Sequence, residues 1–322
     1  MQFQGKRSAV QSAAIWILRR LCTFFCGDTP FSAAYAKQML LTAGVQAALI
    51  LPLLGFRHRL RIPPQLLCGF RLCAAWEAAY LTHCFGRLSI QLHLQYQRAL
   101  LPLLLLMLLY TVPLHDRASA RTASLLLFLA VSGFLLLPVS GIGTAQRILL
   151  HTPAPPVSPL REWADACELP FLPLLMQQQT GADAKRSTAA WTGYRLLFLP
   201  ALVLFGTMQN GRLLHFQGNP FFLLLARTPL SDAVRTDGFW LLLACACGAL
   251  CITFCLQTAK PHLQAQRRML AAAFLPYFLF LALLRMLPQA KAVNGIVNAF
   301  FGVVLPWGIV LCHCLTKRRE TA

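Results

Sequence analysis

Long apolar stretches that contain no charged side chain recur along this chain, and they restrict its fold more than any other feature. A helix that crosses roughly 30 Å of hydrocarbon needs about 20 mostly apolar residues. Four charge-free stretches meet this requirement: residues 38–56, 122–146, 238–259 and 292–316. The sequence therefore predicts an all-α polytopic membrane protein.

Six further stretches extend this prediction to about ten transmembrane helices. Three are shorter but strongly apolar: residues 99–115, 196–211 and 269–284. Helix tilt and long basic side chains that reach the interface make them adequate spans. The other three contain charged or helix-breaking residues: 10–27, 65–85 and 162–179. The ten spans form a single transmembrane domain over residues 1–322, which ends in a short basic tail, residues 317–322.

Composition and charge agree with a membrane protein and exclude other classes. The chain is 57% apolar and 12% charged, whereas soluble proteins average roughly 45–50% and about 25%. The formal charge of +19 would suggest nucleic acid in a soluble protein. Here most basic residues lie in short gaps between apolar runs, as in cytoplasmic loops. We therefore expect a lipid bilayer and no nucleic acid as partner, with both termini in the cytoplasm.

Charged residues inside candidate spans are the first functional candidates, because a charge in hydrocarbon costs at least about 2.5–3.5 kcal/mol on insertion scales. Glu77 lies inside the third span, and Arg19 and Arg20 interrupt the first. These arginines also argue against a cleaved signal peptide. Adjacent residues of a helix point about 100° apart, so at least one arginine should meet protein, water or a carboxylate. We hypothesise that one of them pairs with Glu77.

The sixth span is predicted to be broken. Glu162, Asp165 and Glu168 are spaced by three, which places them along one side of a helix. Pro170 and Pro173 then interrupt it, because proline lacks the amide hydrogen and disfavours helical geometry in the residue before it. A break at membrane depth is tolerated where the backbone faces protein or a cavity, and secondary transporters build binding sites this way.

Alternatives remain open at both candidate breaks. Residues 161–168 would form a surface segment if only residues 169–176 enter the membrane. Cys26, Gly27 and Asp28 would form an unwound stretch of the first span, or simply the loop before the second span, which the neighbouring turn-forming residues favour.

Enzyme motifs are absent from the sequence. It contains no HExxH, GxSxG, GxxxxGK[ST] or dinucleotide-binding fingerprint, so we expect neither an enzyme nor a cofactor. A membrane-embedded enzyme that uses the three carboxylates of the sixth span is an alternative. Cys247, Cys251 and Cys255 recur every four residues. This spacing favours a helix-packing stripe over a metal site.

One region resembles a known family. Asn219-Pro220-Phe221 is followed by Arg235-Thr236-Asp237 directly before the span from Gly238, and Lys6-Arg7-Ser8 precedes the first span. This pattern is similar to the permease-type B subunit of bacterial spore germinant receptors. That family is a branch of the amino acid, polyamine and organocation transporters.

The resemblance implies a LeuT-like five-plus-five inverted repeat, here about residues 8–149 and 160–316. It implies a small germinant, typically an amino acid, bound between broken first and sixth spans. It also implies A-type and C-type partner subunits in the inner membrane of the cell or spore. An active amino acid or ion transporter of the same fold is an alternative.

A zwitterionic ligand needs a positive helix end for its carboxylate and oxygen atoms for its amine. The ligand-binding residues expected on this basis are Cys26, Gly27, Asp28, Glu77, Ala166, Glu168 and Pro170. Arg235 and Asp237 are expected to form a structural ion pair at the start of the eighth span.

Overall fold

The computed structural model describes residues 9–26, 31–56, 62–91, 97–111, 116–141, 146–151, 181–210, 219, 237–259 and 266–320. These residues are almost entirely helical, and no strand occurs among them. The all-α prediction is therefore confirmed for the described part of the chain.

Five long helices form the amino-terminal half: α1 (Ala9–Phe25), α2 (Ala33–Gly55), α3 (Pro64–Gln91), α4 (Gln97–Thr111) and α5 (Asp116–Gly141). They coincide with the first five predicted spans. The Ser32 hydroxyl caps the amino end of α2. It accepts a hydrogen bond from the Tyr35 amide at 3.0 Å, which satisfies one of the free amides of the first turn. The short 3₁₀ helix η3 (Arg147–His151) follows α5 after a gap in the description.

The carboxyl-terminal half contains two helices interrupted by wide π-helical turns. The first consists of α8 (Gly181–Gly193), η4 (Tyr194–Phe198) and α9 (Leu199–Asn210). Then come α12 (Asp237–Ala259) and α13 (Gln266–Met286). The last helix consists of α14 (Ala290–Ala299), η6 (Phe300–Val304) and α15 (Leu305–Glu320). These helices cover the predicted seventh to tenth spans, whereas the sixth, residues 162–179, lies outside the described residues.

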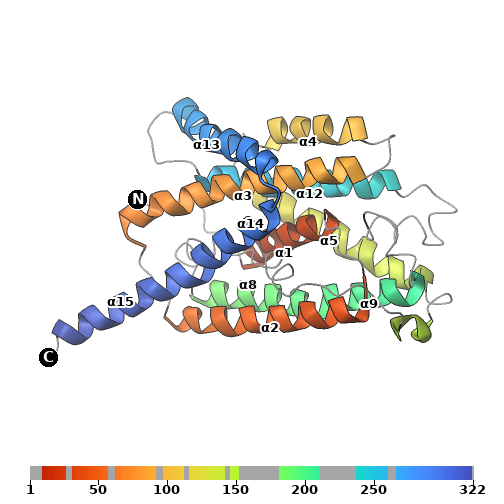
Figure 1. Ribbon diagram of the computed structural model, residues 1–322, viewed down its shortest axis with the longest axis horizontal. Coiled ribbons are helices and arrows are strands. Elements are labelled where there is room, and N and C mark those ends of the chain that lie inside the picture. The colour runs from red at the N-terminus through yellow and green to blue at the C-terminus, as the bar shows by residue number, and fades with distance from the viewer. Residues whose placement is uncertain are drawn as a thin grey trace.

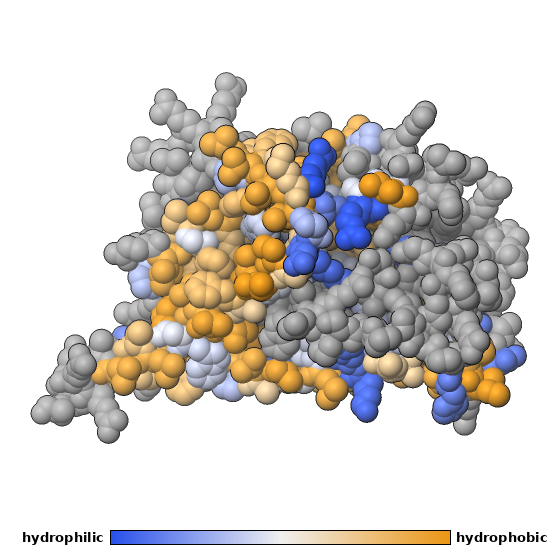
Figure 2. All heavy atoms as spheres, in the orientation of Figure 1, coloured by the Kyte–Doolittle hydropathy of each residue, from blue (hydrophilic) through white to orange (hydrophobic). Residues whose placement is uncertain are grey.

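Four described helices are long and apolar enough to cross a membrane: Ala33–Gly55, Ala182–Gln209, Phe239–Ala259 and Ala290–Leu315. Large apolar side chains are also exposed, among them Leu275, Phe278 and Leu279 on one face of α13. Figure 2 shows such side chains gathered over α3, α13 and the last helix. Long apolar helices with apolar outer surfaces are the features of a membrane protein.

The helices pack in two groups (Figure 1). In one group, α3 packs extensively against α12 and α13, and α12 also packs against α4. In the other group, α2 packs against α8, η4 and α9. The enclosed helix α1 contacts α5, α8 and α12 and so connects the two groups. From Ala13 to Phe25, every α1 side chain except Thr23 is buried.

Candidate functional site

A buried ion pair joins α1 to α3. The Arg19 guanidinium donates a hydrogen bond through Nη2 to Oε2 of Glu77. Arg19 is 5% exposed and Glu77 is fully buried. The hypothesis that an arginine of the first span pairs with Glu77 is therefore confirmed, and Arg19 is the partner.

Helix α3, which packs mainly on α12 and α13 and only lightly on α1, is rich in small residues around Glu77. Ala74, Ala75, Ala78 and Ala79 are all fully buried. Small side chains let helix backbones come together, as is common between helices in membranes. The carboxylate thus lies in a tightly packed interface, where an ionised group is stable only with a charged or hydrogen-bonding partner.

Two cysteine thiols lie close to the ion pair. The charges of Arg19 and Glu77 act on both Cys73 of α3 and Cys255 of α12. One α-helical turn earlier on α12, the thiol of Cys251 lies next to that of Cys22 in α1. The predicted packing stripe is accordingly buried in this interface. All described cysteines are free thiols, and the described residues contain no group of three or more histidine, cysteine or acidic residues that could hold a metal.

The neighbouring arginine is enclosed as well. Arg20 is 1% exposed, and its Nη1 lies 3.5 Å from the hydroxyl of Thr23. Both arginines of α1 therefore meet protein instead of lipid.

A second buried polar centre joins the seventh-span helix to α2. Arg195 of η4 donates a hydrogen bond through Nη1 to Oε1 of Gln46, and its guanidinium carbon lies 5.0 Å from the centroid of the Trp191 ring. Arg195 and Gln46 are both buried. Sequence reasoning missed this centre because it searched for charge-free stretches and therefore began the seventh span at residue 196, one residue after Arg195.

A third polar centre lies between α3 and α14. The indole Nε1 of Trp76 donates to Oδ1 of Asn294 at 2.9 Å. Asn298, one turn further along α14, is also buried. These two asparagines were also missed, although their spacing of four residues within an apolar stretch puts them on one helix face.

The side-chain amide of Asn219 donates to the carbonyl of Phe25 at 2.8 Å and is buried there. This bond satisfies one of the free carbonyls at the carboxyl end of α1. Asn219 is the first residue of the stretch on which the predicted family resemblance rests, and this residue is held at the end of α1.

The described part of the chain includes only some of the predicted ligand-binding residues. Helix α1 is continuous up to Phe25, Cys26 lies in the turn after it, and α2 begins at Ala33. Cys26 is close to Cys84, which is seven residues, or about 10 Å, along α3 from Glu77. Cys26 and Glu77 therefore occupy different levels of the interface.

Most of the other predicted site residues lie outside the described residues. Those outside the described residues are Gly27, Asp28, Glu162, Asp165, Ala166, Glu168, Pro170 and Arg235. Asp237 is the first residue of α12, but its side chain is not among those described. The predicted ion pair between Arg235 and Asp237 stays a prediction.

No protein-family model matches the chain, and no curated protein sequence matches it. Its resemblance to the germinant-receptor subunits therefore stays a prediction.

Proposed function

We propose that this chain is a permease-type receptor subunit of a bacterial cytoplasmic membrane, and that it binds a small polar solute of the amino acid class. The resemblance to germinant-receptor B subunits suggests this role. In that role, the chain lies in the inner membrane of the cell or of the spore, and its partners are A-type and C-type subunits. The proposal includes a LeuT-like arrangement of ten spans.

The pattern of helix contacts carries the proposal. In a five-plus-five repeat, each of the first five spans corresponds to the span five places later. If both helices of a contact are replaced by their counterparts, the result should be another contact that the structure contains. The contact of α3 with α13 becomes that of α12 with α4, and the contact of α3 with α4 becomes that of α12 with α13. Both members of each pair occur. The contact of α3 with α12 becomes itself, and it is the most extensive one among the described helices.

Contacts of the fifth and tenth spans follow the same exchange. Helix α5 packs on α12, and its counterpart α14 packs on α3. Helix α5 also packs on α9. In the equivalent position, Trp307 of the last helix donates through Nε1 to the carbonyl of Leu49 in α2 at 3.0 Å. These matched pairs support two repeats with the same internal packing.

The ion pair supports a solute-binding role for the region where the two helix groups meet. Arg19 belongs to the helix that packs on α5 and α8, whereas Glu77 belongs to the helix that packs on α12 and α13. Ionisable residues inside membrane proteins commonly mark solute or ion pathways. The second carboxylate oxygen of Glu77, Oε1, is buried, and none of the described residues donates a hydrogen bond to it. The proposal assigns this oxygen to the amine of a solute.

The direct test is binding of the common amino acids to the purified protein in detergent, measured by thermal shift and then by calorimetry. A solute that binds only the folded state at 100 times its dissociation constant stabilises it by about 2.7 kcal/mol. We expect saturable binding that is lost in Glu77→Gln and kept in Asp183→Asn, a control on α8. If none of the amino acids binds, the proposal is wrong.

Flux separates a receptor from a transporter of the same fold. Proteoliposomes that contain the protein should bind the solute without accumulating it if the chain acts as a receptor. Accumulation that depends on an ion gradient would instead identify an active transporter.

A further inference from the structure

Three basic side chains gather where α3 and α13 meet at the surface of the molecule. His83 and Arg87 are four residues apart on α3, so they lie on the same face of that helix. Arg285 belongs to the last turn of α13. The charges of Arg87 and Arg285 both act on His83. The three side chains therefore form one group, which we call the basic cluster.

The packing of α13 on α3 holds Arg285 beside the other two residues. The two helices are in extensive contact, and next to His83 the Thr82 hydroxyl meets that of Tyr277 at 3.0 Å. The charge of Arg285 acts on Tyr277 as well as on His83. The contact between the two helices thus determines where the basic cluster lies.

The basic cluster is accessible and positively charged. Arg87 and Arg285 are exposed, and His83 is half-buried. The acidic residues whose side chains the structure describes are Glu77 and Asp183. Glu77 is fully buried in its ion pair, and Asp183 belongs to α8 in the other helix group. Side chains of like charge repel one another, so the basic cluster favours an anion that lies among them.

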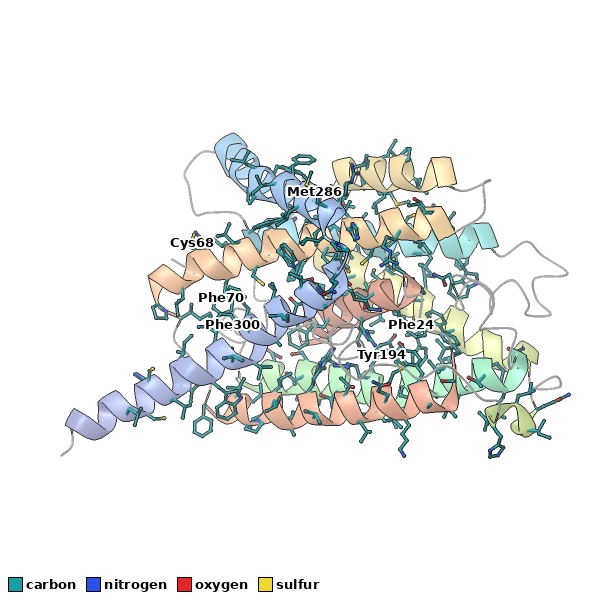
Figure 3. All side chains as sticks on the ribbon, viewed as in Figure 1. Phe24, Cys68, Phe70, Tyr194, Met286 and Phe300 are labelled. Atoms are coloured by element: carbon teal, nitrogen blue, oxygen red, sulfur yellow. The ribbon has the colours of Figure 1, made fainter. Side chains whose placement is uncertain are left out.

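An exposed apolar face of α13 leads to the basic cluster. Leu275, Leu279 and Met286 are strongly exposed, and their spacing of four and seven residues aligns them along one side of the helix. Phe278, also exposed, lies two turns before Arg285 on the same side. Figure 3 marks Met286 at the end of α13, and Figure 2 shows hydrophilic side chains beside the apolar surface there. An apolar face that ends in positive charge matches an amphipathic anion.

The predicted orientation places the basic cluster in the outer leaflet. With both termini in the cytoplasm, α3 and α13 are the third and ninth spans, and both end on the outer side. Arg87 lies in the last turns of α3, which ends at Gln91, and Arg285 directly precedes the last residue of α13. Long basic side chains near helix ends extend toward the headgroups.

We infer that the basic cluster binds the phosphate of an anionic phospholipid of the outer leaflet, whose acyl chain lies on the apolar face of α13. The guanidinium groups of Arg87 and Arg285 donate charge-assisted hydrogen bonds to the phosphate oxygens, as basic pockets between membrane helices do for acidic headgroups. A zwitterionic phospholipid is disfavoured, because its own ammonium group meets three basic side chains. This inference does not depend on the proposed function.

The test measures lipid binding to the purified protein in a neutral detergent by native mass spectrometry. Dioleoyl phosphatidylglycerol is the anionic probe, and dioleoyl phosphatidylcholine has the same acyl chains but no net charge. We expect phosphatidylglycerol to bind at least about fivefold more tightly, which is the contribution of one basic residue near a membrane surface. Equal affinity for the two lipids would overturn the inference. Displacement of phosphatidylglycerol by an equal concentration of free glycerol phosphate would do so too, because the site would then recognise the phosphate alone.

The matched variants remove two positive charges from different places. Arg87→Gln with Arg285→Gln alters the basic cluster, whereas Lys185→Gln with Arg186→Gln alters exposed residues of α8. We expect the cluster variant to lose about fivefold in phosphatidylglycerol affinity for each arginine and to keep its phosphatidylcholine affinity. The α8 variant should bind both lipids as wild type does. If the cluster variant fails to fold, Arg285→Gln alone decides, with an expected loss of about fivefold.

Two results with the variants would contradict the assignment. Wild-type affinity for phosphatidylglycerol after loss of the cluster arginines would show that they do not hold the headgroup. Equal losses in the cluster and α8 variants would show a general attraction by net charge instead of a site. Neither result concerns amino acid binding, so the proposed function would stand or fall by its own test.

Discussion

The Glu77 carboxylate balances a guanidinium in a place that water does not reach. Replacing Glu77 by glutamine removes the negative charge and leaves Arg19 buried in an interface of alanine and cysteine side chains. We expect Glu77→Gln to lower the free energy of unfolding by about 3–5 kcal/mol, as the loss of one partner of a buried pair does. Denaturant unfolding in detergent, followed by tryptophan fluorescence, measures this change.

The matched control replaces both partners. The double variant Arg19→Met with Glu77→Leu leaves no charge uncompensated, and such replacements of buried pairs are often neutral or stabilising. We expect it to be more stable than Glu77→Gln alone. If Glu77→Gln is as stable as wild type, the ion pair contributes nothing to the fold.

Close contact between α12 and α3 depends on one missing methyl group. A Cβ atom at Gly248 would lie 2.3 Å from Cε2 of the buried Phe85 ring. We expect Gly248→Ala to destabilise the protein by about 1–3 kcal/mol, because the packed ring must move. Gly44→Ala is the control: nothing lies within 4 Å of its added Cβ, so alanine there should be neutral or stabilising. Melting temperatures of the two variants measure the difference.

For single residues, the sequence predicted a contact correctly where a buried charge needs a partner. It predicted that Glu77 meets an arginine of the first span, since an isolated charge in an apolar helix is too costly. It had no basis for choosing Arg19 over Arg20, because the rotation of α1 about its axis depends on packing against α5, α8 and α12. Neutral polar residues such as Asn298 gave a weaker signal, since one amide costs far less than a charge.

At the scale of helices, both wide turns lie just before a proline. Leu199 donates its amide to the carbonyl of Tyr194, five residues back, and Leu305 does so to Phe300. Each of these leucines directly precedes a proline, Pro200 or Pro306. Proline cannot donate a hydrogen bond and its ring clashes with the carbonyl four residues earlier. The π-helical turns accommodate that clash without ending the helix.

The contact between α2 and the seventh-span helix depends on Arg195 and its partners. We expect Gln46→Leu to destabilise the protein by about 1.5–3 kcal/mol, because it removes an acceptor from a buried cation. Arg195→Lys should also destabilise it, since an ammonium group cannot stack its flat face on Trp191. Thermal unfolding of the purified variants checks both expectations, and a wild-type melting temperature for Gln46→Leu would show that the hydrogen bond is dispensable.

Helix positions were predicted more accurately than helix limits. Apolar stretches located α2, α4, α5, α12 and α13 because lipid-facing and core-facing positions are both apolar in a membrane protein. The seventh helix was predicted too short, since it begins at Gly181 with polar residues and includes the buried Arg195. A search for charge-free stretches misses the part of a span that contains a charged side chain shielded from lipid by other helices.

At the scale of the whole molecule, the loop charges predict that both termini are cytoplasmic. Cys68, near the start of α3, is exposed, whereas Cys247 and Cys251 are buried. We expect a membrane-impermeant maleimide to label Cys68 in inside-out vesicles and not in right-side-out vesicles, because the predicted orientation puts the end of the second span in the cytoplasm. Mass spectrometry of labelled peptides reads out the site, and Cys68→Ser is the control. Labelling of Cys68 from the outside would reverse the predicted orientation.

The arrangement of the helices relative to one another was predicted from the family resemblance more than from the hydropathy of the sequence. Hydropathy gives the number of spans but does not say which spans touch, because every membrane helix has apolar faces. The exchange of contacts between α3 and α12, and between α4 and α13, became visible only from the packing. Small residues such as the alanines around Glu77 and the glycine at 248 were the available sequence signal for the closest contacts.

The wide turn at Phe300–Val304 also determines the direction in which every later side chain of the last helix points. An α-helix rotates about 100° per residue, so deletion of a single residue in this turn would swing Trp307 away from the Leu49 carbonyl and its ring away from Phe56. Substitutions along the final helix change one side chain at a time, whereas a one-residue deletion changes the direction of all the side chains that follow it. The length of this segment should therefore tolerate far less variation than its composition.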